Sequence, residues 1–145
     1  MKPLNPWQSY RQVATSTASP GQLVLMLYEG ALRFLERAQT GFTLDDPAES
    51  NSTINNNIIR AQGIIWELDS SLNMAAGGEL ALQLRRLYDY FDRLLQQSNM
   101  KKEPNGISEV IRRLTVLRDA WAVLLQKQGD TDQPEATAAV GLATV

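Results

Sequence analysis

The sequence predicts an all-α protein, folded as an antiparallel up-down four-helix bundle. Apolar residues recur every three or four positions along four long segments, which is the spacing of a helix with one buried face. Short stretches rich in Gly, Pro, Asn and Asp separate these segments. No stretch alternates apolar and polar residues with β-branched side chains, as a half-buried strand would. The 145 residues suffice for one domain with a sizeable core.

The first helix is expected over residues 20–39. Ser19 is a good N-cap because its side-chain oxygen accepts from a backbone N–H of the first turn. Pro20 suits the first helical position, where a missing N–H costs nothing, and Gly41 suits the position after the helix. Residues 23–28 are all apolar or aromatic, so this helix is apolar on more than one face. It therefore lies at the centre of a bundle or keeps apolar surface for another chain.

The second helix can begin at Pro47, after the turn-forming Asp45 and Asp46. Its apolar residues form a heptad seam: Ile54, Ile58, Ala61, Ile65, Leu68 and Leu72. Gly77-Gly78 is expected to break the chain before the third helix, which is expected to end near Asn99. The third seam consists of Leu80, Leu84, Leu87, Phe91 and Leu94.

The fourth helix follows a turn predicted at residues 104–106, and Ser108 is its expected N-cap. Gly129 is expected to stop it. Its seam is Ile107, Val110, Leu114, Leu117, Trp121 and Leu124. Together the four segments predict one bundle domain over residues 18–128.

Two segments flank this domain. In residues 1–17, an N-terminal cap segment, Trp7, Tyr10 and Val13 recur at three-residue spacing and predict one face of a short helical turn. Residues 129–145 are rich in Asp, Thr, Ala and Gly without a periodic face. We expect this tail to be disordered.

Composition excludes several classes of function. The chain has no cysteine and no histidine, so disulfides, thiol catalysis and the commonest general base and metal ligand are absent. We therefore expect no enzymatic activity, no metal and no cofactor. A net charge of −2 argues against nucleic-acid binding. No apolar run approaches the ~18 residues of a membrane span and the N-terminus does not resemble a signal peptide, which predicts a cytoplasmic protein without membrane insertion.

The helices carry more apolar residues than their seams need. A wide bundle core accounts for about half of this surplus. The remainder predicts an exposed patch larger than a monomer usually shows, suited to a groove that receives an amphipathic helix. The surplus residues are Val24, Leu25, Leu32, Ile59, Ile64, Trp66, Tyr88, Tyr90 and Leu95.

Several short motifs, in order, resemble a known family. They are Thr17-Ala18-Ser19-Pro20 with Leu23 and residues 26–32, then Arg60-Ala61 with Ile64-Ile65 and Glu67-Leu68, Gly77-Gly78-Glu79 with Ala81, Leu84 and Leu87-Tyr88-Asp89-Tyr90, and Leu117-Arg118 with Ala120-Trp121. Over roughly residues 5–125 the chain is similar to FliS-type flagellar export chaperones. It departs from the family's usual pattern at Glu29, where Asp is common, and at Trp7, where Tyr is common.

The resemblance implies an ATP-independent export chaperone that holds the disordered C-terminal segment of flagellin in the cytoplasm. Such a chaperone prevents premature polymerisation and supports delivery to the flagellar export apparatus, whose gate components are candidate further partners. The family's N-terminal segment can lie over part of the binding site. The expected partner-binding residues are Tyr10, Val13, Tyr28, Leu32, Asn57, Arg60, Ala61, Ile64 and Leu68. Of these, Ala61 and Leu68 suit the core equally well.

Two other interpretations stay open. One is a structural bundle whose apolar surplus forms a homodimer, the free chaperone itself being expected as a monomer or weak dimer. The other is a catalytic bundle that takes its cofactor from outside.

Overall fold

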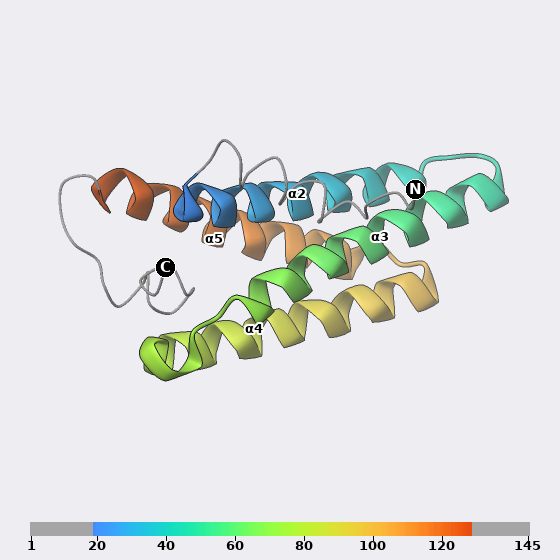
Figure 1. Cartoon of the computed structure of the whole chain (residues 1–145). Coiled ribbons are helices and arrows are strands. Elements are labelled where there is room, and N and C mark those ends of the chain that lie inside the picture. Colours follow the sequence, from blue (N-terminus) through green and yellow to red (C-terminus); the bar gives the residue numbers. More distant parts are fainter. Residues whose placement is uncertain (1–18, 129–145) are drawn as a thin grey trace, which may run out of the picture.

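The computed structural model describes residues 19–128, which form four helices: α2 (Pro20–Gly41), α3 (Pro47–Ser70), α4 (Met74–Lys101) and α5 (Asn105–Gln128). Successive helices run in opposite directions (Figure 1). Each helix packs against two others, α2 and α4 both lying beside α3 and α5. The predicted all-α up-down bundle is thus confirmed. The short helical turn expected within residues 1–17 and the tail 129–145 lie outside the described residues.

The first two helices begin as predicted. At the start of α2 the Gln22 backbone N–H donates to the Ser19 hydroxyl over 3.2 Å, and the Ser19 N–H donates to the Gln22 side-chain oxygen over 3.1 Å. This reciprocal capping box satisfies two of the donors that a helix start leaves unpaired. Pro47 opens α3, where the Asp46 carboxylate accepts from the Ala48 N–H over 3.1 Å.

The predicted break of the chain at Gly77-Gly78 is confirmed by the non-helical backbone of Gly78, although a short helical stretch precedes it. Helix α4 begins at Met74, and the Asn73 side chain caps it by accepting from the Ala76 N–H over 3.0 Å. The chain turns sharply at Gly78, with φ 55° and ψ −132°, a conformation that a side chain would strain. The glycine pair therefore separates a short first stretch of α4 from the long stretch that carries the predicted seam. The helix continues past Asn99 to Lys101.

The predicted N-cap of the fourth helix is wrong, because α5 already begins at Asn105. The Ser108 hydroxyl lies inside the first turn, where it donates to the Pro104 carbonyl over 3.2 Å and accepts from the Gln39 amide of α2 over 2.9 Å. Close by, Gly106 lies against α4. A Cβ at this position would overlap the Ser98 hydroxyl oxygen, so the glycine permits this close approach of α4 and α5.

The heptad seam of α3 is confirmed, since all six of its residues are buried. In α4 the buried residues differ from the predicted seam. Tyr88 and Leu95, assigned to the surplus, are buried together with Phe91. The predicted seam residues Leu80, Leu84, Leu87 and Leu94 are half-buried. Because α4 packs against both α3 and α5, residues on the two flanks of its buried line are partly covered as well.

In α5 the predicted seam is largely confirmed, because Ile107, Val110, Leu114 and Trp121 are buried. Leu117 and Leu124 are half-buried. The Trp121 indole N–H donates to the Gly21 carbonyl over 2.8 Å, which ties the last turns of α5 to the first turn of α2.

Candidate functional site

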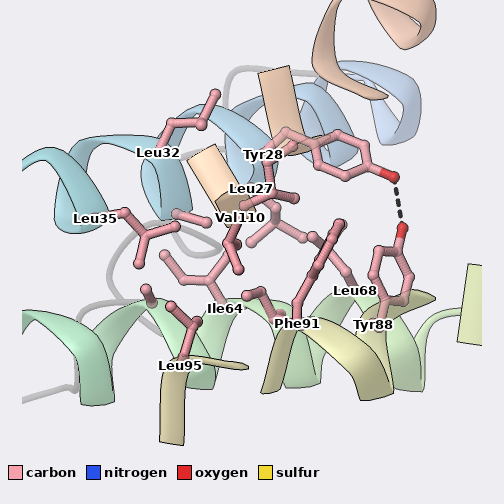
Figure 2. Close-up of a cluster of buried hydrophobic side chains, with 14 of the residues drawn as sticks. Leu27, Tyr28, Leu32, Leu35, Ile64, Leu68, Tyr88, Phe91, Leu95 and Val110 are labelled. Carbon is pink, nitrogen blue, oxygen red and sulfur yellow. Dashed lines mark hydrogen bonds between the residues drawn. The ribbon is translucent and has the colours of Figure 1, made fainter. Parts of the chain in front are cut away.

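Five of the predicted partner-binding residues lie in the core of the bundle. Tyr28, Leu32, Ala61, Ile64 and Leu68 are each at most 5% exposed. Figure 2 shows Tyr28, Leu32, Ile64 and Leu68 among the buried side chains. In this arrangement they stabilise the fold and offer a partner no contact surface. Their assignment to partner binding stays a prediction, as does that of Tyr10 and Val13, which lie outside the described residues.

Tyr28 also makes the most deeply buried side-chain hydrogen bond between helices. Its hydroxyl meets that of Tyr88 at 2.5 Å, and both side chains are almost fully buried (Figure 2). Burial raises the pKa of Tyr28 and raises the pKa of Tyr88 well above its ordinary value. The pair joins α2 to α4, which lie diagonally across the bundle. Beside it a cavity of about 140 Å³ opens between α2, α4 and α5, lined by leucines of α4 and α5.

Asn57 is a predicted site residue with an unusual hydrogen-bonding state. It is 7% exposed, and its amide N–H donates to the Thr53 carbonyl over 2.8 Å. The side-chain oxygen of Asn57 is buried without a hydrogen-bond partner. Leaving a buried acceptor unpaired costs on the order of 1–3 kcal/mol. A donor supplied by another molecule would remove that cost.

Arg60 lies one turn further along α3 and is exposed. Its guanidinium carbon is 5.9 Å from the centre of the half-buried Phe34 ring of α2, and that of Arg37 is 5.6 Å from the same ring. Two cations thus lie over one aromatic ring, and one of them, Arg60, is close in sequence to the unpaired Asn57 acceptor. We call these four residues, Phe34, Arg37, Asn57 and Arg60, the α2–α3 face.

Sequence reasoning identified Asn57 and Arg60 on this face and missed Phe34 and Arg37. The available signal was an aromatic residue and an arginine three positions apart on the first helix, a spacing that places them on one side. That signal does not show which helix packs beside them. The contribution of α3 to the same ring becomes visible only in the folded chain.

A second surface lies on the other flank of α3, against α4. Here a hollow of about 400 Å³ is bordered by Ile59 and Trp66, which are 54% and 71% exposed. Both residues belong to the predicted apolar surplus, of which Val24, Leu32, Ile64, Tyr88 and Leu95 are buried. Of the nine surplus residues five are thus buried, as the wide core predicted, Leu25 and Tyr90 are half-buried, and Ile59 and Trp66 are exposed.

The described residues hold few features of a reaction centre. Within residues 19–128 no group of three or more acidic side chains is arranged to hold a metal ion. No helix in this part of the chain has the length and apolar character needed to cross a membrane. On one flank, α3 and α2 together form an aromatic and cationic surface. On the other flank, α3 and α4 border a hollow with an apolar rim. Surfaces of this kind are typical of helical bundles that bind other polypeptides.

Comparison with known proteins agrees with this class and makes it specific. Residues 3–128 match the family model described as flagellar protein FliS. The flagellar secretion chaperone FliS of Bacillus subtilis is 39% identical over 124 residues, covering 86% of this chain and 89% of the relative. That of Salmonella typhimurium is 34% identical over 125 residues, covering 83% and 90%. The flagellar secretion chaperone FliSB of Pseudomonas aeruginosa is 30% identical over 118 residues, covering 79% and 90%. The chain belongs to the FliS family of flagellar secretion chaperones.

Proposed function

We propose that this protein is an ATP-independent export chaperone that binds the disordered C-terminal segment of flagellin in the cytoplasm. It prevents premature polymerisation and supports delivery to the flagellar export apparatus. Membership of the FliS family supports a flagellar client. The sequence contains no Gly-x-x-x-x-Gly-Lys phosphate loop, which supports action without ATP. The observation that carries the binding role is the pair of exposed guanidinium groups, of Arg37 and Arg60, over the half-buried Phe34 ring.

The α2–α3 face offers complementary groups to an incoming polypeptide. The Asn57 oxygen is covered in the free protein, so a backbone N–H of the client reaches it only when the Asn57 side chain turns outward on binding, and the new bond then removes the cost of the unpaired acceptor. The guanidinium groups of Arg37 and Arg60 donate to client carbonyl or carboxylate oxygens. The half-buried Phe34 ring beside them packs against an apolar client side chain. These contacts favour a segment with both free backbone groups and apolar side chains, as a disordered chain provides.

A titration of the full chain with the C-terminal segment of flagellin from the same organism tests this role. Asn57→Leu keeps the side-chain volume close and removes the unpaired oxygen, so we expect the free protein to be no less stable. Client binding should weaken about tenfold, because the client's donor loses its acceptor. Arg60→Gln should weaken binding several-fold. Arg112→Gln, an exposed arginine of α5, is the matched control and should leave the dissociation constant unchanged.

The effect on the free protein separates recognition from simple damage to the fold. If Asn57 only stabilises the fold, replacing it should lower the free energy of unfolding of the free protein. If Asn57 contacts the client, replacing it should weaken client binding and leave that free energy unchanged. Unchanged flagellin binding in both Asn57→Leu and Arg60→Gln contradicts the assignment of this face. The alternative function, homodimerisation, rests on the exposed Ile59 and Trp66. A concentration-independent dimer that ignores the flagellin segment would favour it.

A further inference from the structure

The apolar cavity beside the Tyr28–Tyr88 pair, which we call the α4–α5 cavity, has a volume of about 140 Å³. It shares no lining residue with the α2–α3 face or with the hollow beside Trp66. Its lining residues, all within residues 19–128, carry no charge. They include the exposed Ala120 and four half-buried leucines, Leu80, Leu84, Leu117 and Leu124. The cavity is therefore open to solvent and can take up an apolar side chain from outside the bundle.

The cavity lies at the end of the bundle where α5 finishes. The start of α4 and the end of α5 are both found at this end (Figure 1). Leu124, a lining residue, precedes the last residue of α5, Gln128, by four positions, which is about 6 Å along the helix axis. On α4, the lining residue Leu80 follows the kink at Gly78 by two positions. The chain thus leaves α5 about one helical turn beyond the cavity.

The tail that follows α5, residues 129–145, divides into two parts by composition. Residues 129–135 contain three acidic residues, whereas residues 136–145 contain no charged side chain. The large apolar residues of the second part are Val140, Leu142 and Val145. Leu142 follows Gln128 by 14 residues, a length that spans at most roughly 50 Å when extended and about 20 Å on average as a flexible chain. Both lengths exceed the distance from the end of α5 back to Leu124.

We propose that the tail folds back in the free protein and docks in the α4–α5 cavity, with the Leu142 side chain inserted among the leucines of α4 and α5. The volume of the cavity suits one branched aliphatic side chain, and insertion removes apolar surface of both partners from water. Val140 lies two residues before Leu142, so an extended tail presents both side chains on one side. The acidic residues 129–135 serve as a spacer in solvent. This inference does not rest on the flagellin-binding role.

Position and composition favour the tail over two other occupants. A tethered segment of this length reaches the cavity at an effective concentration on the order of millimolar, far above that of a second copy in dilute solution. Residues 1–18 are tethered through α2, whose lining residue Tyr28 lies eight positions from the helix start, about 12 Å along the axis. That segment also offers Trp7 and Tyr10, whose aromatic rings are larger than a leucine side chain.

The absence of cysteine from the sequence permits a clean test by disulfide formation in the full chain. Ala120→Cys combined with Ala143→Cys puts one thiol at the cavity and the other next to Leu142, which stays intact. Equilibration in a glutathione redox buffer gives the effective concentration of the two thiols. The control pair is Val123→Cys with Ala143→Cys. Val123 is 48% exposed on the same helix, does not line the cavity and lies closer to the tail along the chain.

The two pairs separate docking from mere tethering. Tethering alone would favour the control pair, because its loop is three residues shorter. Docking should instead give the Ala120 pair an effective concentration at least tenfold higher than that of the control pair. Adding Leu142→Asn to the Ala120 pair should remove this advantage, whereas Thr131→Asn in the spacer should leave it unchanged. Both substitutions lie in the tail, and circular dichroism verifies that the bundle stays helical.

Other results overturn the proposal in distinguishable ways. Equal effective concentrations in the two pairs mean that the tail does not dock in the cavity. An Ala120 pair that is unaffected by Leu142→Asn means that this leucine is not the inserted side chain. Disulfides between two chains make a second copy the occupant. If Ala120→Cys pairs more strongly with Val13→Cys than with Ala143→Cys, the N-terminal segment is the occupant. No flagellin is present in these measurements, so their outcome is independent of the flagellin titration.

Discussion

The hydroxyl pair of Tyr28 and Tyr88 predicts a characteristic pattern of stabilities. Both rings are buried, and each hydroxyl is the other's hydrogen-bond partner at 2.5 Å. Tyr28→Phe removes one hydroxyl and leaves the other buried without a partner, which costs about 1–3 kcal/mol. Tyr88→Phe should cost a similar amount for the same reason. Removing both hydroxyls leaves two apolar rings of nearly the same shape. The double variant should therefore lose clearly less free energy of unfolding than the two single variants lose together.

Urea unfolding followed by far-ultraviolet circular dichroism measures the free energy of unfolding of the unchanged protein, the two single variants and the double variant. Tyr90→Phe is the control, since its hydroxyl bonds to Glu109 in a partly exposed position and its loss should be smaller. The coupling between Tyr28 and Tyr88 should be at least about 1 kcal/mol. Strictly additive losses would refute the reasoning, because they would mean that each hydroxyl finds another partner when its own is removed.

Further predictions concern pH, the core and the α4–α5 contact. Burial raises the pKa of Tyr28 and Tyr88, so these two tyrosines ionise at lower pH in the unfolded chain than in the folded protein. The free energy of unfolding should therefore fall as the pH rises above about 10, the ordinary pKa of tyrosine. The fall should be smaller in the double phenylalanine variant. Ile64→Val should cost about 0.5–1.5 kcal/mol in thermal unfolding, whereas Ile64→Asp should prevent folding because it buries a charge. Gly106→Ala should lower the melting temperature through overlap with Ser98, and Ser98→Ala should restore part of the loss.

The sequence was most informative where one helix face meets the core. The seam of α3 could be predicted because its apolar residues repeat every three or four positions and all of them are buried. The break at Gly77-Gly78 could be predicted too, but the short helical stretch before it could not, because the glycines give no sign of the Asn73 cap that starts a turn ahead of them. Ser108 was misassigned for a similar reason, since a serine inside a first turn has the same sequence pattern as a cap.

The candidate site was predictable only in part. Asn57 and Arg60 were found because they flank the seam of their own helix. Ile64 lies on the same side of that helix and is nevertheless fully buried, a difference that depends on packing and not on spacing. Trp66 was recognised as apolar surplus, yet its hollow also requires Asp92 of the next helix. Contacts between helices decide which of these side chains are buried. The periodicity within one helix does not show those contacts.

We propose that this chain orders a disordered flagellin segment on its surface. The decisive experiment is a calorimetric titration with the C-terminal segment of the same organism's flagellin, repeated over a range of temperatures. We expect a one-to-one complex with a large negative heat-capacity change, because apolar surface is buried as the segment folds. If folded protein at tens of micromolar releases or absorbs no heat at any temperature, the chain does not bind this segment.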